Sequence, residues 1–249
     1  PAYRDLASGG PSFPHRDEAE RLEELASFPA ARRRRVSALL AEYQARIGAG
    51  PAAVEAARLL ARPDALAVTT GQQPGVLTGP LFTVYKAVTA VSLARREARR
   101  LGRPVVPVFW IVSDDHDWEE ASRLAVVSAS GEVRRFQLRS PCAGRCLGDV
   151  PVPEEAPALV EGVVAAGCGD GTAAPNAREV GAFLAAAAGA SASVAEWFAR
   201  LMARLFGDLG LVLLDPLAPG WREEAEEFWA RALADPGRVE EGLAAGAER

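Results

Sequence analysis

Lysine is almost absent from this 249-residue chain, in which Lys86 stands against twenty-seven arginines. Asparagine occurs once, histidine twice and glutamine four times. An exposed positive charge is generic, so arginine can supply it at most positions, but a planar guanidinium cannot replace a compact ammonium. We therefore expect Lys86 to occupy a position where the kind of cation matters.

Cysteine is also scarce, and its positions argue against the usual cysteine frameworks. Cys142, Cys146 and Cys168 are odd in number, and no second Cys/His pair completes a zinc site. The sequence contains no recognisable signal peptide and no apolar stretch of about 20 residues. We expect a cytoplasmic protein with no structural metal and no membrane partner. Because the chain begins with Pro1 and has Met202 as its one methionine, we expect it to be part of a longer protein.

Charge of neither sign dominates the composition. The formal net charge is -5, with 49% hydrophobic and 24% charged residues, which is typical of a globular domain. These values do not predict a general surface for nucleic acid or membranes. The run of four arginines at residues 32–35 lies in helical sequence, and we expect it to form a solvated helix face.

The order of sequence patterns predicts an α/β protein with a parallel sheet, N-terminal helices and a small antiparallel hairpin. Residues 1–62 are expected to form a helical segment packed on the core, with three helices over residues 16–62. Residues 63–220 are expected to form the core, and residues 221–249 the start of a helical connecting region. Short apolar runs predict three buried parallel strands, at residues 65–70, 104–112 and 210–216.

Between the first two strands, residues 80–101 are predicted to form a helix, giving a right-handed βαβ unit. We expect this helix to bury one stripe, formed by Leu81, Val84, Val88, Val91, Ala98 and Leu101. Residues 123–138 predict an antiparallel hairpin. Residues 140–190 are low in complexity and predict a loop-rich insertion, after which a helix at 192–207 returns the chain to the third strand.

The segment "VTTGQQPGVLTGPLFTVYK", residues 68–86, contains the lysine and leads from the first strand into this helix. Ligands of open α/β sheets bind outside the carboxyl ends of the strands. The segment matches neither GxGxxG nor the P-loop, but free amides at the helix start favour an anion. Lys86 reaches this edge if its side chain points back toward the N-terminus. The candidate ligand-binding residues are Gly71, Gln72, Gln73, Gly75, Thr78, Gly79 and Tyr85.

The alternative for this segment is a turn that only joins strand to helix. Glycines allow tight turns, Pro80 suits a helix start, and Lys86 would then extend into solvent. Two of the four glutamines stand side by side here, however, at a sheet position where loops usually hold the site. We therefore favour a functional role for Gln72, Gln73 and Lys86.

The segment "SDDHDWEE", residues 113–120, follows the second strand, so we expect it to face the same crevice. Adjacent titratable groups, Asp114, Asp115, His116 and Asp117, require a nearby cation such as Lys86, a metal or a ligand amine. His116 is a candidate acid or base, oriented by a neighbouring carboxylate. The alternative is a solvated turn in which an aspartate caps the next helix.

These segments, together with "GRPVVPVFWIVSDDHDWEEASRL" and "LFGDLGLVLLDP", resemble the N-terminal half of the BshC family, the cysteine-adding enzymes of bacillithiol biosynthesis. The resemblance is specific over residues 63–124 and looser over the third strand. Asp114 stands where the family more often has glutamate. The resemblance implies a Rossmann-like core related to nucleotide-binding synthetases, helical connecting domains, and a C-terminal coiled coil that forms a homodimer.

The resemblance also implies a reaction, in which the carboxyl group of cysteine is joined to the amine of glucosaminyl malate. ATP is the implied activator of the carboxylate, and no metal is expected beyond Mg²⁺ accompanying the nucleotide. The resemblance does not assign roles to residues; from the residues themselves we expect 71–80 to bind a phosphate or the malyl carboxylate, oriented by Gln72 and Gln73. Lys86 would offset negative charge at the reacting carboxyl group. His116, held by Asp115 or Asp117, would accept the proton of the attacking amine.

Two other interpretations stay open at this point. A metal-dependent hydrolase would use the Asp/His cluster together with Asp215, which ends the third strand. A non-catalytic nucleotide-binding or scaffold domain would tolerate substitution of Gln72, Gln73 and His116. Metal analysis of the purified protein distinguishes the hydrolase from a metal-free ligase. Measurable turnover distinguishes an enzyme from a non-catalytic domain.

Overall fold

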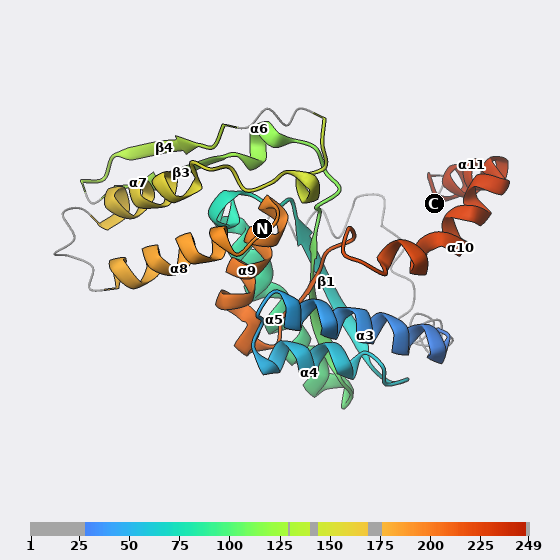
Figure 1. Ribbon diagram of the computed structural model, residues 1–249. Helices are drawn as coiled ribbons and strands as arrows, with labels where there is room; N and C mark the ends of the chain where they lie inside the picture. Colours follow the sequence, from blue (N-terminus) through green and yellow to red (C-terminus); the bar gives the residue numbers. More distant parts are fainter. Residues whose placement is uncertain (1–27, 129, 140–143, 169–175, 248–249) are drawn as a thin grey trace, which may run out of the picture.

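The computed structural model describes residues 28–128, 130–139, 144–168 and 176–247 (Figure 1). The first of the three expected N-terminal helices lies largely outside these residues. In chain order the helices, 3-10 turns (η) and strands are α3 (Ala30–Arg46), α4 (Pro51–Leu59), β1 (Leu66–Gln72), η1 (Val76–Thr78), α5 (Leu81–Leu101), β2 (Val105–Ile111), α6 (Trp118–Ala121), β3 (Arg123–Val127), β4 (Val133–Gln137), η2 (Leu147–Asp149), α7 (Ala156–Cys168), α8 (Ala177–Gly189), α9 (Val194–Phe206), η3 (Gly207–Leu209), β5 (Val212–Leu214), α10 (Trp221–Ala234) and α11 (Pro236–Ala247).

The predicted parallel sheet is present, with strand order β1-β2-β5 in the described part of the chain. Both neighbouring pairs are parallel, and Gln72 of β1 is paired with Ile111 of β2, so these two strands end together. The predicted hairpin is also confirmed, because β3 and β4 pair antiparallel. The architecture is therefore the expected α/β class, with helices far exceeding strands.

Helices cover both faces of the sheet. Side chains of β2 alternate between the two faces, and Phe109 and Ile111 pack with α5 and α9, while Val106 and Val108 pack with α3 and α4. Phe109 is fully buried and its ring centroid lies 6.1 Å from that of Phe198 on α9. Burial on both faces explains why these strands are continuous apolar runs without alternation.

Gln44, on α3, completes the open edge of β5. Its side chain is fully buried; the amide Nε2 donates to the Leu213 carbonyl at 2.7 Å, and its Oε1 accepts from the Leu213 N–H at 3.0 Å. In the described residues β5 pairs with β2 alone, so this side chain replaces a neighbouring strand on the other side. Buried backbone N–H and C=O groups at the edge of a sheet need hydrogen-bond partners, which explains why the polar Gln44 lies in the core.

A second layer is built by the β3–β4 hairpin with α7, α8 and α9 (Figure 1). Trp197 and Leu201 of α9 are buried in this layer's core, and Val76 of η1 joins them from the loop after β1. The segment 140–190 was expected to be rich in loops, but it contains α7 and α8. Its alanine-rich sequence has helix propensity, and the helices are held by packing against α9.

The buried face of α5 differs from the predicted one. Its buried residues are small, and they include none of the predicted stripe except Val91: Thr83, Ala87, Ala90, Val91 and Ala94. Leu81 and Val88 are instead 65% and 45% exposed. Val84 of the predicted stripe packs partly buried against the same core as Val91, so the prediction was right for part of the stripe and wrong for Leu81 and Val88. Small side chains allow the helix to lie close to the sheet.

The arginine run of α3 holds neighbouring segments instead of only facing solvent. Arg35 forms an ion pair with Glu224 of α10, and Arg32 donates to the Glu224 carbonyl at 2.7 Å. Arg33 donates to the Ala65 carbonyl at 3.1 Å, just before β1. No residue of α10 is buried, so these arginine contacts help to place it beside α3.

Candidate active site at the carboxyl edge of the sheet

The two segments singled out in the sequence leave the same edge of the sheet. Because β1 and β2 are parallel and end together, the loops after Gln72 and Ile111 start side by side. The Val112 N–H donates to the Gln72 carbonyl at 3.1 Å, which extends the pairing into the loops. This is the edge at which ligands of open α/β sheets bind.

Lys86 points back from α5 toward the end of β1, as predicted. Its ammonium donates to the Gly71 carbonyl at 3.1 Å and to Gln72 Oε1 at 2.8 Å, and lies 4.9 Å from the ring centroid of Phe82. Successive strand carbonyls point to opposite edges, and the Gln72 carbonyl faces β2, so the Gly71 carbonyl lies on the free edge of β1. Lys86 therefore has a structural contact, and within the described residues one of its three N–H groups remains for a ligand.

Gln73 joins the first loop to the second. Its side-chain amide donates a short hydrogen bond to Asp115 Oδ2, across 42 positions of sequence. Asp115 Oδ1 also accepts the backbone N–H groups of His116, at 2.6 Å, and Asp117, at 3.0 Å. Lys86 and the acidic turn are thus bound by adjacent residues, Lys86 by Gln72 and Asp115 by Gln73.

These contacts determine the charge state of Asp115. Partial burial acts to raise the pKa of this carboxyl group, but hydrogen bonds from the Asp117 N–H, the Gln73 amide and the His116 N–H together lower the pKa below its ordinary value. Asp115 is therefore a fixed anion at neutral pH. It organises the turn and is not poised to exchange protons.

His116 and Asp117 have different surroundings. The His116 side chain is 77% exposed, and its Nδ1 lies 3.8 Å from Asp115 Oδ1, which is ion-pair range without a hydrogen bond. Asp117 Oδ1 accepts the Glu120 N–H at 3.0 Å and so caps α6. Of the two carboxylates expected to hold His116, Asp115 is the neighbour, while Asp117 is the helix cap that the alternative predicted.

The glycine-rich loop is tightly folded. A Cβ on Gly75 would lie 2.7 Å from the Gly79 Cα atom, and a Cβ on Gly71 would lie 2.8 Å from the Trp110 carbonyl oxygen. Gly71 and Gly75 are therefore required by packing between the loop and its neighbours. Leu77 and Thr78 adopt positive φ values of 51° and 75°, which β-branched Thr78 adopts only under strain.

The start of α5 is not capped by a side chain. Pro80 takes the cap position, one residue before the helix, and its carbonyl accepts the Thr83 N–H at 2.9 Å. The first N–H groups of a helix lack intrahelical acceptors and favour an anion. Within the described residues the buried Thr83 hydroxyl has no hydrogen-bond partner either. The first N–H groups of α5 are therefore the donors that the expected phosphate or carboxylate would use.

The candidate residues around the loop line two different cavities. Lys86 and the 63% exposed Tyr85 line a cavity of about 330 Å³ along β1. Thr78 and Gly79 line one of about 630 Å³, whose other walls come from β3, α7, α8 and α9. The helix start thus lies between two mainly apolar cavities, one of which includes Lys86.

A buried hydrogen-bond network at the same edge was not predicted as such. Asp215, after β5, accepts from the Ser113 hydroxyl at 2.5 Å, the Leu217 N–H at 2.9 Å and the Tyr43 hydroxyl at 3.4 Å. Burial, followed by the Asp215 charge, raises the pKa of Tyr43 well above its ordinary value, so the phenol stays protonated. The network fixes the base of the Asp115 turn to β5 and α3.

Asp215 therefore has protein partners in place of the metal that the hydrolase interpretation assigns to it. In the part of the chain that the structure describes, no group of three or more His, Cys, Asp or Glu residues is arranged to hold a metal ion. Two sequence features could have indicated the region around Asp215: glutamine is a rare residue type in this chain and occurs at Gln44, and Asp215 stands at the end of a predicted strand. Tyr43 carries no sequence signal of its own.

The fold is that of a Rossmann-like α/β domain, with the candidate site in the loops after neighbouring parallel strands. Residues 12–249 match the family described as "Bacillithiol biosynthesis BshC, N-terminal Rossmann-like domain". The chain belongs to this family. Within the described residues, no helix is both long and apolar enough to cross a membrane.

Three relatives share the name "Putative cysteine ligase BshC". The protein from Symbiobacterium thermophilum is 40% identical over 86% of this chain and 40% of its own length. Those from Heliobacterium modesticaldum and Desulforamulus reducens are each 35% identical, over 93% and 84% of this chain and 43% and 38% of their own lengths. The chain thus spans about two fifths of the length of these relatives.

Proposed function

We propose that the full-length protein is a ligase that joins the carboxyl group of cysteine to the amine of glucosaminyl malate, and that this chain carries its Rossmann-like part. The family and the names of the relatives support the cysteine-ligase class. The observation that carries the site is the hydrogen bond from Gln73 to Asp115, because it joins both signature loops at one edge of the sheet.

In this proposal Lys86 and the start of α5 bind the negatively charged groups of the substrates. Lys86 is oriented by Gly71 and Gln72 and retains one N–H for a carboxylate or phosphate oxygen. The uncapped amides before Thr83 add neutral donors beside it. Both features stabilise negative charge that develops on the reacting carboxyl group.

His116 is the proposed base. When the amine of glucosaminyl malate attacks the cysteine carbonyl carbon, a C–N bond forms and the nitrogen must lose a proton. The exposed imidazole, next to the anionic Asp115, is placed to accept that proton and is stabilised by the carboxylate once charged. ATP would supply the leaving group on the cysteine carboxyl carbon, and the bond to that group would break as the C–N bond forms; Mg²⁺ would accompany the nucleotide.

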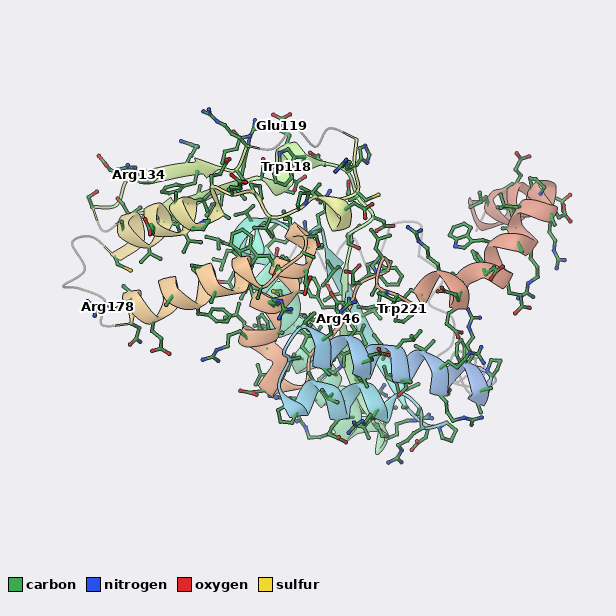
Figure 2. All side chains as sticks on the ribbon, in the orientation of Figure 1. Arg46, Trp118, Glu119, Arg134, Arg178 and Trp221 are labelled. Carbon is green, nitrogen blue, oxygen red and sulfur yellow. The ribbon has the colours of Figure 1, made fainter. Side chains whose placement is uncertain are left out.

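The test follows product and nucleotide together. The full-length protein is incubated with cysteine, glucosaminyl malate and ATP, and the amide-linked thiol, AMP and ADP are quantified. Lys86→Met and His116→Ala are each expected to lower turnover by about 100-fold or more, which is the usual contribution of such groups. Arg134→Met is the matched control, because Arg134 is exposed on β4, far along the hairpin from the sheet (Figure 2).

Two results contradict the proposal. Absence of the thiol product with the wild-type protein removes the assigned reaction. Turnover in both Lys86→Met and His116→Ala equal to that of Arg134→Met keeps the reaction but removes the assigned residues. Circular dichroism of each variant excludes loss of folding as the cause.

A further inference from the structure

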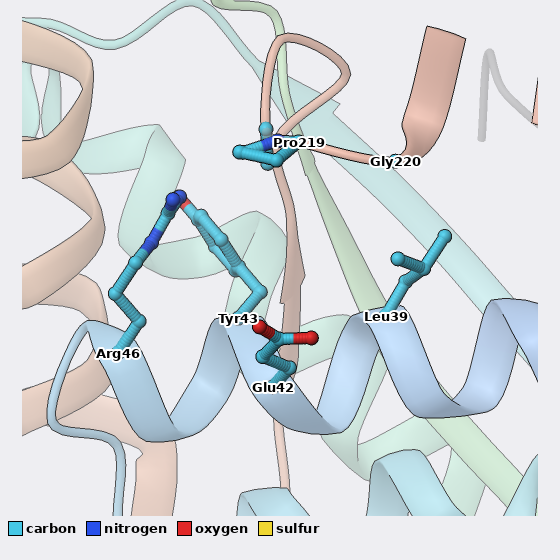
Figure 3. Close-up of a pocket in the computed structure, with 7 residues that line it drawn as sticks. Leu39, Glu42, Tyr43, Arg46, Pro219 and Gly220 are labelled. Carbon is cyan, nitrogen blue, oxygen red and sulfur yellow. The ribbon is translucent and has the colours of Figure 1, made fainter. Parts of the chain in front are cut away.

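A small cavity lies between α3 and the turn that follows β5 (Figure 3). Its volume is about 190 Å³, and its walls include Glu42, Tyr43 and Arg46 on one side and Pro219 and Gly220 on the other. It stands outside the carboxyl end of β5, at the same edge of the sheet as the candidate site. No role described so far uses it.

The cavity contains one charge of each sign. Glu42 and Arg46 are four positions apart on α3, so their Cβ atoms are about 5–6 Å apart on one helix face. Among the described residues neither side chain forms an ion pair, and both are exposed at the cavity. The Arg46 guanidinium lies 5.0 Å from the Tyr43 ring centroid, which orients the cation without using its N–H groups.

The walls between these charges are held rigidly. Tyr43 is buried, with its hydroxyl donating to Asp215 at 3.4 Å, and Asp215 is fixed in turn by Ser113 and Leu217. Opposite it, Gly220 adopts a φ of 87° and packs directly on Leu39 of α3. Preformed walls reduce the entropy that a ligand loses on binding.

Size and charge together define the ligand. At about 30 Å³ per water molecule, the cavity holds the volume of roughly six waters, which is below the range of about 300–1,000 Å³ for drug-sized ligands. A nucleotide is too large for it. A free α-amino acid is small enough and carries an ammonium and a carboxylate on one carbon, matching the two side chains.

We propose that this cavity binds a free α-amino acid as its zwitterion, with the carboxylate on Arg46 and the ammonium on Glu42. Resting on the proposed function, the amino acid is cysteine. Glu42 then keeps the cysteine amine protonated, so that it does not compete with the amine of glucosaminyl malate as a nucleophile. Arg46 binds the carboxylate of the free amino acid before that group reacts beside Lys86. Glu42 and Arg46 thus determine which substrate is used and which amine reacts.

Calorimetric titration of the full-length protein under reducing conditions, with and without glucosaminyl malate, tests this proposal. The ligands are L-cysteine, its methyl ester, which lacks the carboxylate, and 3-mercaptopropionate, which lacks the amine. Wild-type protein is expected to bind each analogue about tenfold or more weakly than cysteine. Arg46→Gln should no longer distinguish cysteine from the ester, and Glu42→Gln should no longer distinguish it from 3-mercaptopropionate.

The control variants are Arg178→Gln and Glu161→Gln, which make the same changes at exposed positions of α8 and α7. They should retain wild-type discrimination. The proposal is overturned if wild-type protein does not bind millimolar cysteine under either condition, or if Arg46→Gln and Glu42→Gln discriminate like the controls.

The outcome is separable from that of the proposed reaction. If the expected binding pattern appears but no amide-linked thiol forms, the amino-acid site stands and the proposed reaction fails. If product forms, with an unchanged KM for cysteine in both cavity variants, the reaction stands and this site fails.

Discussion

Replacing the buried Gln44 by leucine is expected to destabilise the protein strongly. The side chain satisfies both the N–H and the C=O of Leu213, at 3.0 Å and 2.7 Å, and is 0% exposed. Leucine fills a similar volume but has no polar atoms, so both backbone groups would be buried without partners. At about 1–3 kcal/mol for each unsatisfied group, the expected loss is about 2–6 kcal/mol.

Hydrogen exchange and calorimetry measure this loss directly. The Leu213 amide should become exchangeable in Gln44→Leu, and the unfolding transition of this domain should fall by at least about 4 °C, at about 2–4 °C per kcal/mol. Gln137→Leu is the matched control, because Gln137 is exposed on β4 and its side chain donates a long hydrogen bond to the Ser122 hydroxyl at 3.4 Å, so its loss should stay within about 1 kcal/mol. Equal stability of the two variants, with the Leu213 amide still protected, would refute this reasoning.

Three further predictions concern the candidate site. Hydrogen bonds lower the pKa of Asp115 despite its partial burial, so wild-type protein should be more stable than Asp115→Asn at neutral pH. This difference in stability should shrink as the pH falls below the ordinary aspartate pKa of about 3.9 and through the lowered pKa of Asp115. A difference in urea midpoint that stays constant with pH would contradict this prediction. Lys86→Arg should fail to restore the turnover lost in Lys86→Met, leaving it at least about tenfold below wild type, because guanidinium is larger and planar; full rescue would show that any cation suffices. Gly75→Ala should lower stability by about 1–3 kcal/mol, since its Cβ would lie 2.7 Å from Gly79 Cα, whereas Gly189→Ala, with open space at the Cβ position, should not.

Much of the fold could be predicted because its signals are local. The strands of the sheet are short apolar runs bounded by proline and glycine, and the predicted parallel strands, crossover helix and hairpin are present. The buried face of α5 could not be predicted in the same way. Most of its buried residues are small, among them Ala87, Ala90 and Ala94, whose size matters more than their hydrophobicity.

The segment 140–190 shows a related difficulty. Low complexity indicated loops, but α7 and α8 form there because their alanines favour helix and their apolar residues pack against Trp197 and Leu201 of α9. That packing partner lies further along the chain. The local composition therefore indicates the helix propensity of this segment, but it does not predict the packing against α9 that stabilises α7 and α8.

The location of the candidate site could be predicted from the sequence, but the role of each residue within it could not. Parallel strands and rare polar residues predicted Lys86 and the Asp115 turn at one edge of the sheet, and in the structure the adjacent Gln72 and Gln73 bind Lys86 and Asp115 respectively. Whether an aspartate orients His116 or caps α6 depends on backbone geometry, which assigns the cap to Asp117. Tyr43 and Asp215 meet across 172 positions, so no local pattern reveals their contact.

The central claim is that the loops after β1 and β2 serve one reaction, and a double-mutant cycle tests it most directly. Turnover of cysteine and glucosaminyl malate would be measured for the full-length wild-type protein, Lys86→Met, His116→Ala and the double variant. Residues that act as a unit show strongly non-additive losses, so the double variant should be little worse than the poorer single variant. Losses that multiply, or single variants with wild-type turnover, would contradict the account.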